Sequence, residues 1–383
     1  MSHDISEIYS NKLIISGLVP GQRYKYRVGD AYNEKYSSEG VFTAYSNTDD
    51  NFNFIYMADS QQSFSSSNVN AWKNTLSSAF ASMNNAEFIA LGGDLNNWNA
   101  IEAQWKGLMD YNKEYVMNIP IMPAAGNHEI NMTCSGTKIE YYDFNYHFNV
   151  PYTSEYDVGN TDKYYNNGAT GTYYSYDYKN VHFVVLNTND IYVTSKPSNK
   201  GKYVLSDAQM AWLNADLSDA KQREESGEIN FTIVYMHAGL YTTGAAGLGK
   251  DYKETVDLYD QLQDVFADYN VDLVLSGHDH TYSRTKVLDK NGTVSENGGV
   301  VYMTGGVASV NAPGIAYFEN SDRISVGASK LNTADKYEYY AKQTYTNCWT
   351  ELSVTSNAIT VNTFSGVSAT LLDSFTVTKN NLN

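Results

Sequence analysis

Short alternating runs of apolar and polar residues occupy the first part of the chain, between residues 12 and 45. Two such runs, residues 12–15 and 24–28, flank the sequence Val19-Pro20-Gly21-Gln22. Proline and glycine at the two central positions of a tetrapeptide favour a tight turn. The pattern therefore predicts β-strands joined by turns in this region.

From residue 50 onward, apolar runs alternate with stretches of helical periodicity, as in proteins that interleave strands and helices. The runs that predict strands are residues 52–57, 87–91, 119–123, 231–236 and 271–275. Residues 68–83 carry apolar side chains three or four positions apart, which predicts an amphipathic helix. Ser206 and Gln209 predict a capping box that opens a second helix around Trp212. After residue 299, strand-like runs with glycines predict a second sheet.

Composition narrows the range of partners. The 383 residues contain 26 Lys and Arg against 43 Asp and Glu, a formal net charge of -17. This balance argues against nucleic acid or anionic lipid as the main partner, because both require a basic surface. An anionic substrate remains compatible, since bound cations reverse the local field inside a cleft. No apolar run is long enough to span a membrane.

Five predicted strands between residues 52 and 275 each run into a short polar motif. Open α/β sheets bind ligands at the carboxyl ends of their strands, so these motifs are expected to meet. Four of the seven histidines lie in them. The motifs are Asp59, Gly93-Asp94, Gly126-Asn127-His128-Glu129, His237 and Gly277-His278-Asp279-His280.

These residue types indicate a metal site. First-row metals accept carboxylate, imidazole and amide oxygen together. One carboxylate can bridge two cations about 3.5–4 Å apart. A single aspartate after a strand, such as Asp59, is more often a turn or helix cap. The prediction of a two-metal site therefore depends on the whole series and not on any one member.

The series resembles that of the calcineurin-like metallophosphoesterases, and two features narrow the resemblance to the purple acid phosphatases. Residues 277–284, Gly-His-Asp-His-Thr-Tyr-Ser-Arg, are similar to their GHxHxYxR motif. Residues 205–217 are similar to their QxxWLxxDL helix. The resemblance implies the α/β class, with a four-layer αββα sandwich of two mixed sheets over residues 49–383.

Residues 18–29 resemble the late strands of a fibronectin type III-like module, which the larger purple acid phosphatases carry before the catalytic domain. Some 45 residues are about half of a ~100-residue sandwich. Residues 1–48 are therefore expected to form a partial module. A closed, complete small domain before residue 50 would contradict this expectation.

The resemblance also assigns roles. Asp94 would bridge two metals, and Asp94 and His128 would be the catalytic residues. His128 would lie over the substrate, with Asn127 as the second substrate-binding residue. The metal ligands implied are Asp59 and His280 for the first ion, Asn127, His237 and His278 for the second, and Asp94 for both.

Other polar residues near the motifs receive weaker assignments. Glu129 either orients a ligand or is a solvated loop acid. Tyr282 and Arg284 are expected to pack structurally and not to contact substrate. His182 lies in an apolar strand and is expected to be a hydrogen-bonded core residue, and His147 receives no role.

The expected reaction is hydrolysis of phosphate monoesters by a metal-bound hydroxide at the dinuclear site. A phosphodiesterase or nucleotide pyrophosphatase is the first alternative, because the same metal pair serves both ester types. Residues 131–175, rich in Tyr and Asn, are expected to shape the pocket that decides between them. A cell-surface binding protein without catalysis is the second alternative.

The sequence departs from the purple acid phosphatases at Asn97. Their second motif, GDxxY, supplies a tyrosinate that holds the ferric ion and gives the colour. Here the motif reads Gly93-Asp94-Leu95-Asn96-Asn97, which removes one anionic ligand. The expected cofactors are therefore two divalent ions such as Zn, Mn or Fe(II). The segment 241–244 also lacks the paired histidines of some plant members.

Cysteines and targeting signals add little. Cys134 and Cys348 could form one disulfide bond, but two free thiols are equally compatible with the sequence. The start Met1-Ser2-His3-Asp4 lacks the basic and then apolar pattern of a secretory signal. An extracellular or cell-envelope location is implied by the family resemblance alone.

Overall fold

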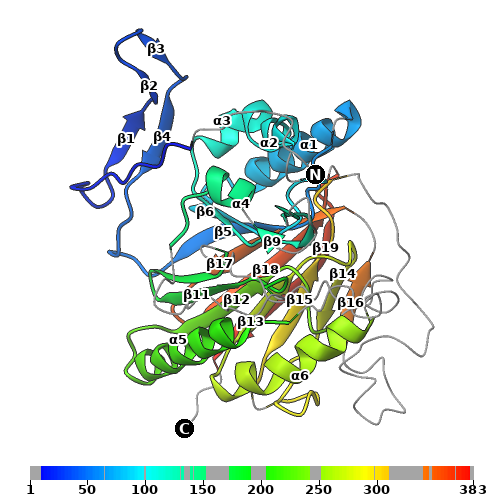
Figure 1. The fold of residues 1–383 in the computed structure, drawn as a ribbon. Coiled ribbons are helices and arrows are strands. Elements are labelled where there is room, and N and C mark those ends of the chain that lie inside the picture. Colours follow the sequence, from blue (N-terminus) through cyan, green and yellow to red (C-terminus); the bar gives the residue numbers. More distant parts are fainter. Residues whose placement is uncertain are drawn as a thin grey trace.

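The structure is a computed structural model. It describes residues 10–63, 65–98, 101–129, 131–132, 139–140, 142–151, 172–190, 204–241, 252–296, 298–309, 340–344, 347–366 and 368–379. Two mixed sheets, stacked face to face, form its centre (Figure 1). Two mixed sheets were predicted for the region after residue 48, and this prediction is confirmed.

The first sheet has six strands in the order β19-β18-β17-β5-β6-β7. Its parallel half follows the predicted apolar runs closely: β5 (Phe52–Met57), β6 (Phe88–Leu91) and β7 (Ile121–Pro123). The antiparallel half comes from the C-terminal region: β17 (Cys348–Val354), β18 (Ala358–Ser365) and β19 (Leu371–Thr378). The two halves join where β17 pairs antiparallel with β5.

The second sheet has seven strands in the order β10-β11-β12-β13-β15-β14-β16. Its parallel core consists of β11 (Val181–Leu186), β12 (Phe231–Met236), β13 (Leu273–Ser276) and β15 (Val301–Gly305). The antiparallel strands at its edges are β10 (Tyr174–Tyr178), β14 (Tyr282–Thr285) and β16 (Tyr340–Thr344). Every residue of β11 and β12 is buried, as expected for strands covered on both faces.

Helices cover the outer faces of this stack (Figure 1). Those beside the six-stranded sheet are α1 (Ser66–Ser82), α2 (Glu102–Leu108) and α3 (Lys113–Val116), with the short α4 (Tyr142–His147) nearby. Those beside the seven-stranded sheet are α5 (Asp207–Glu225) and α6 (Tyr252–Asp268). Among the described residues, no helix is long and apolar enough to cross a membrane.

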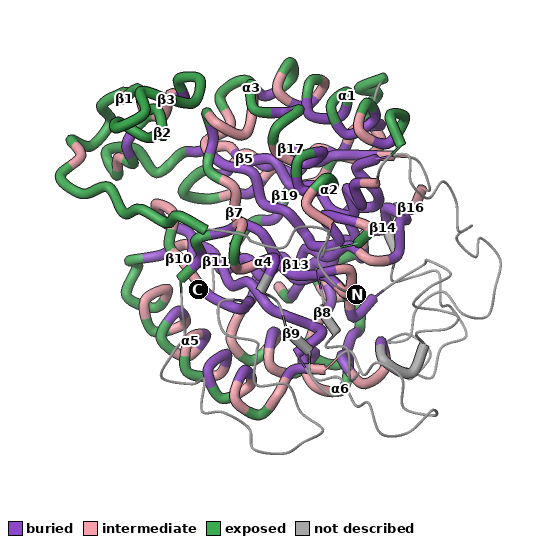
Figure 2. Tube along the Cα trace, turned by 45° about the horizontal axis from the view of Figure 1, so that its top comes forward, coloured by how far each residue is buried: buried purple, intermediate pink, exposed green. Residues whose placement is uncertain are grey.

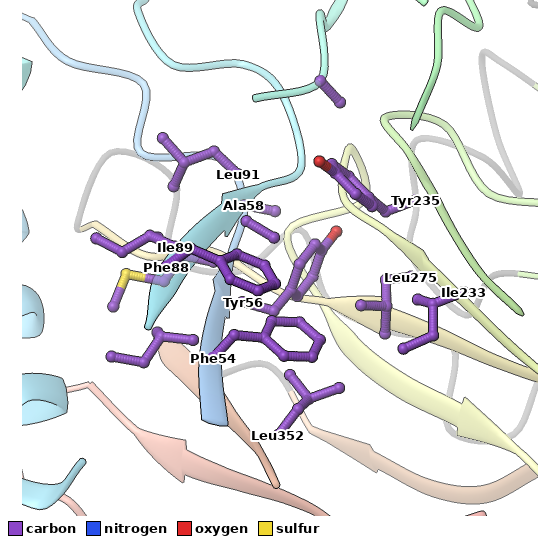
Figure 3. Packing of buried hydrophobic residues seen from close by; sticks show 14 of the residues in the cluster. Phe54, Tyr56, Ala58, Phe88, Ile89, Leu91, Ile233, Tyr235, Leu275 and Leu352 are labelled. Atoms are coloured by element: carbon purple, nitrogen blue, oxygen red, sulfur yellow. The ribbon is translucent and has the colours of Figure 1, made fainter. Parts of the chain in front are cut away.

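The main core lies between the sheets. Figure 3 shows Phe54 and Phe88 of the first sheet facing Ile233 and Leu275 of the second. The rings of Phe54 and Phe88 stack with centroids 4.8 Å apart, and both are buried. Aromatic pairs of this kind stabilise a core beyond their buried area, so this pair helps to hold β5 and β6 together.

The C-terminal strands do not form a sheet of their own, contrary to the prediction. β15 and β16 join the seven-stranded sheet, whereas β17, β18 and β19 complete the sheet that begins with β5. Sequence patterns indicate that a segment is a strand but not its pairing partner. Here the partner of β17 is β5, almost 300 residues earlier in the chain.

The helix predicted around Trp212 is α5, but only half of the capping box is present. Ser206 accepts a hydrogen bond from the Gln209 backbone N–H at 3.1 Å, as an N-cap residue should. The Gln209 side chain does not return the bond, because it is buried and binds Asn187 and Asp190 instead. Asp190 takes over that role by accepting from the Ser206 N–H at 3.0 Å.

The N-terminal region stands apart from the sheets (Figures 1 and 2). β1 (Arg23–Tyr26) pairs with β4 (Gly40–Thr43), and β2 (Gly29–Asp30) pairs with β3 (Lys35–Tyr36). The predicted turn is confirmed: Gln22 N–H donates to the Val19 carbonyl at 3.1 Å, and Gly21 has φ 74°. The strand predicted at residues 12–15 is wrong, since this segment has no strand to pair with among the described residues.

Candidate metal centre

Polar loops follow the parallel strands at one edge of the stack. Asp59 comes shortly after β5, Asp94 after β6, and Asn127 after β7. In the other sheet, His237 follows β12 directly, and the loop with His278 and His280 follows β13. Because the parallel strands of each sheet end on the same side, the fold brings these loops together.

The side chains from the two sheets meet. His237 Nε2 lies 3.1 Å from Asp94 Oδ1 and 3.1 Å from Asn127 Oδ1. His280 Nε2 lies 3.3 Å from Asp59 Oδ1. Two groups of three residues each offer ligand atoms that lie within 4.8 Å of one another inside the group. One group is Asp94, His237 and His278, and the other is Asp59, Asp94 and His280. We call the six residues Asp59, Asp94, Asn127, His237, His278 and His280 the ligand cluster.

The backbone of the ligand cluster is unusual. Asp59, Asp94, His278 and His280 have φ angles of 54°, 51°, 71° and 53°. This left-handed region is uncommon for residues other than glycine and costs of order 1–3 kcal/mol per residue. Such strain persists only where the surrounding structure enforces it, which is typical of functional sites.

The glycines before the ligands are required for close approach. A Cβ atom on Gly126 would overlap the Asp94 carboxylate, and one on Gly277 would overlap the Asp59 carboxylate. On Gly93 it would lie 2.7 Å from His237 Nδ1. The backbone of one loop therefore packs directly against the ligands of its neighbours.

Glu129 is buried at the centre of two of these loops. Its carboxylate accepts hydrogen bonds from the N–H groups of Asp94 at 2.8 Å, Leu95 at 2.9 Å and Gly126 at 2.8 Å. Burial, together with the neighbouring Asp94 carboxylate, raises the pKa of Glu129 to about 7. Glu129 is therefore no solvated loop acid: it ties the Asp94 loop to the Gly126 loop.

Charges within the cluster are strongly coupled. Burial alone would raise the pKa of Asp94, yet the imidazoles of His237 and His128 hold it well below its usual range. Burial would lower the pKa of His237, but the carboxylates of Asp94 and Asp59 raise it to about 10. A metal ion that binds there requires the imidazoles in their neutral form, so metal binding would release any protons that they carry.

His128 faces outward from the cluster. Its side chain is 32% exposed, whereas that of Asp94 is 2% exposed. Its Nδ1 bonds the Asn97 carbonyl at 2.8 Å, and its Nε2 lies 3.8 Å from Asp94 Oδ2. The Asp94 carboxylate raises the pKa of His128. Asn97 thus holds one nitrogen of this partly exposed imidazole, and the other nitrogen lies beside the Asp94 carboxylate.

The ligand cluster fits a pair of divalent cations. It combines two carboxylates, three imidazoles and one amide, the mixture that borderline first-row metals accept. His280 Nδ1 is buried and has no hydrogen-bond partner among the described residues. Asp94 belongs to both groups of ligand atoms, as a bridging carboxylate must.

Residues outside the ligand cluster have structural partners. Tyr282 and Arg284 both donate to Asp373, at 2.8 and 2.7 Å, in agreement with the packing role expected for them. His182 is bonded at both ring nitrogens, to Asp177 and Asp216. His147 bonds the Asp143 carbonyl at 2.8 Å and stacks on Trp105.

Three sequence expectations fall wholly or mostly on residues that are not described. Cys134 is one such residue, whereas Cys348 is described and is a buried free thiol that donates to the Gly305 carbonyl. Most of the stretch 131–175 and of the segment 241–244 also lies outside the described residues.

Sequence reasoning missed Gln61, whose amide reaches Asp94 Oδ2 at 3.2 Å. A polar residue in a loop after a strand carries no signal that would identify it.

The part of the chain that carries the ligand cluster matches a known protein family. Residues 52–282, more than half of the chain, match the family described as calcineurin-like phosphoesterase, and the chain belongs to this family. The match begins with β5 and ends just after the loop of His278 and His280, so it contains the whole ligand cluster.

Relatives of known sequence include purple acid phosphatases. An uncharacterized protein of Mycobacterium tuberculosis is 30% identical over 207 residues, covering 52% of this chain and 35% of its own. Purple acid phosphatase 21 of Arabidopsis thaliana is 26% identical over 198 residues, covering 52% of this chain and 38% of its own. The chain thus spans well under half the length of these relatives.

Among solved structures, a purple acid phosphatase from yellow lupin seeds has the same fold. The two superpose with a TM-score of 0.71 at 17% sequence identity, over 96% of this chain and 61% of the lupin chain. At this identity the likeness shows the fold alone.

Proposed function

We propose that this protein hydrolyses small phosphate monoesters at a dinuclear divalent metal site formed by the ligand cluster. The observation that carries the proposal is the meeting of six ligand residues from two sheets, with Asp94 shared between two groups of ligand atoms. Divalent cations there would supply the positive charge that a phosphate dianion needs and would acidify water. Asp59 and His280 would hold the first ion, Asn127, His237 and His278 the second, and Asp94 both.

In this proposal, His128 provides the contact with the reacting phosphate. Among the ion pairs of the metal centre, the side chain of His128 is the most exposed. The Asn97 carbonyl fixes its Nδ1 atom. Its raised pKa favours the protonated form, which can hydrogen-bond a phosphoryl oxygen and protonate the departing alkoxide. Asn127, the second substrate-binding residue, lies beside it in the chain and faces His237.

The metals are proposed to be divalent because the second motif offers no phenolate. Asn97 stands where a tyrosinate would be required, and its backbone donates to Gln62 and accepts from His128. Two carboxylates and neutral ligands leave two divalent ions with excess positive charge, enough to attract a phosphate in an acidic protein. Protein loaded with iron should therefore be colourless, and a visible tyrosinate-to-iron absorption band would contradict this part.

The test is elemental analysis of the purified protein, with phosphatase activity before and after chelation. About two metals per chain, with activity lost to chelator and restored by a divalent ion, would support the proposal. Parallel assays on an aryl phosphate and a bis-aryl phosphate decide between monoesterase and diesterase. Absence of metal and of activity on both esters after reconstitution would favour the binding-protein alternative.

Two expectations from the family resemblance remain part of the proposal. Residues 1–48 are proposed to be part of a fibronectin type III-like module, supported by the two small antiparallel pairs and by exposed apolar side chains such as Ile14, 90% exposed. An extracellular or cell-envelope location is proposed from the relationship to purple acid phosphatases. Fractionation of the native host would test the location directly.

A further inference from the structure

Gln61 lies beside the ligand cluster in a conformation that glycine would adopt more easily. Its φ angle is 35°, in the left-handed region, and the residue is buried, with only 6% of its surface exposed. A non-glycine residue there costs of order 1–3 kcal/mol. The chain thus keeps a strained, buried amide two residues after Asp59, which requires a reason beyond the turn itself.

The loops after β5 and β6 run side by side and place this amide. Gln61 N–H donates to the Asp94 carbonyl at 2.8 Å, and Gln62 N–H donates to the Leu95 carbonyl at 2.9 Å. Gln62 also pairs with Asn96 in an isolated parallel bridge. The strand pairing therefore continues past both strands, so the backbone of Gln61 is fixed relative to Asp94.

The side chain of Gln61 then meets the shared carboxylate. Its Nε2 donates to Asp94 Oδ2 at 3.2 Å. The other oxygen, Oδ1, accepts from the His128 N–H at 2.9 Å and faces His237 Nε2 at 3.1 Å. Gln61 is the neutral side-chain donor on Oδ2, and with the contacts on Oδ1 it fixes the plane of the carboxylate.

We infer that Gln61 is a positioning residue that orients the bridging carboxylate Asp94 and thereby sets the affinity of the centre for its metal pair. The inference rests on the proposed function, because it concerns the same ligand cluster. Groups that hydrogen-bond a metal ligand fix its orientation, and their loss commonly lowers metal affinity 10–100-fold. A neutral amide does this without adding another negative charge beside Asp94.

The experiment measures binding of Mn²⁺ or Zn²⁺ alone to metal-free protein by calorimetry, with no substrate present. In Gln61→Gly the left-handed backbone is relaxed and the amide is removed. In Gln61→Met the side chain keeps its length and loses only the amide. Both variants are expected to bind the metal pair at least tenfold more weakly than the wild type, with metal-free unfolding midpoints close to it.

Ala369 provides the matched control. It is exposed and has φ 47°, so Ala369→Gly relaxes the same kind of backbone at a residue outside the ligand cluster. Its metal affinity is expected to equal that of the wild type. Wild-type affinity in both Gln61 variants, or an equal loss in Ala369→Gly, would overturn the inference. A wild type that binds no metal would instead overturn the proposed function.

Discussion

Two buried histidines, one in a strand and one directly after the neighbouring strand, both lie beside aspartate side chains. The residues around them differ. His182 lies in β11, and His237 follows the neighbouring β12. Each lies within 3.1 Å of an aspartate oxygen. Burial would lower both pKa values, but the nearby carboxylates raise that of His182 to about 9 and that of His237 to about 10.

The hydrogen bonds around His182 are complete. Asp177 and Asp216 take its two ring nitrogens at 2.8 and 2.9 Å, Arg223 pairs with Asp177 at 2.7 Å, and Ser175 donates to Asp216 at 2.6 Å. We call these five residues the ion-pair cluster. Both nitrogens of the imidazole are used, and each has a carboxylate as its partner.

The ligand cluster is arranged differently. Several imidazoles meet two carboxylates and an amide, four of its residues have left-handed backbones, and His280 Nδ1 has no partner among the described residues. Histidine beside aspartate is therefore insufficient evidence for a metal site. The distinguishing features are several ligand types from separate strands and a backbone forced to bring them together.

The largest expected effect is that of Asp94→Ala. Removing the carboxylate shared by both groups of ligand atoms should reduce bound metal below two per chain and lower turnover roughly 10³-fold. Metal analysis and aryl phosphate hydrolysis measure both. The matched control is Asp177→Asn in the ion-pair cluster, which should leave metal content and turnover unchanged. Equal losses in both variants would remove the distinction between the clusters.

The second prediction concerns His128→Gln. Because His128 faces outward and is not among the ligand residues, its loss should lower turnover roughly 10²–10³-fold while two metals per chain remain bound. Stoichiometry by elemental analysis and kinetics on the same preparation are required. Loss of a metal ion in this variant would make His128 a ligand and would contradict its proposed contact with substrate.

The six residues of the ligand cluster lie together in the structure, as the sequence led us to expect, because their meeting follows from topology. Parallel strands that end at one edge deliver Asp59, Asp94 and His237 to one place, whatever the details of packing. The role of Glu129 stayed open, because its burial and its backbone N–H partners are properties of the folded loops. Gln61 was missed for the same reason, since nothing local distinguishes it from a solvated turn residue.

The fold was predictable where it depends on local pattern and less so where it depends on long-range pairing. β5 and β12 match their apolar runs residue for residue. The joining of β17 to β5 is set by packing between distant segments, and it was not predicted. The helix α6 was also missed, although Leu258, Leu262 and Phe266 recur four residues apart and are buried.

A third, smaller effect is expected for His182→Gln. The pKa of His182 is raised from 6.5 to about 9 on folding, so its charge stabilises the fold fully below pH 6.5 and ceases to do so as pH rises through 9. The variant should lose on the order of 2 kcal/mol at pH 6, because one of the two partners is half exposed and screened. Denaturant unfolding at pH 6 and pH 10 measures this.

The pH dependence makes the His182→Gln prediction specific. The difference in unfolding free energy between wild type and variant should shrink from pH 6 to pH 10, and metal content should stay at the wild-type value. A difference that grows with pH would mean that His182 is neutral in the folded protein. Its two carboxylate contacts would then need another explanation.

The smallest effect is expected for Ser175→Ala. Its hydroxyl donates to Asp216 Oδ1 at 2.6 Å, while Asp216 Oδ2 holds His182 at 2.9 Å, so the two donors share one carboxylate. Loss of the hydroxyl should cost about 1 kcal/mol, since Asp216 keeps its charged partner. Combined with His182→Gln, the loss should exceed the sum of the single losses, because Asp216 then has neither donor. Additive losses would show that the ion-pair cluster is a set of independent contacts. The two clusters would then share histidine and aspartate side chains but not the coupling between them.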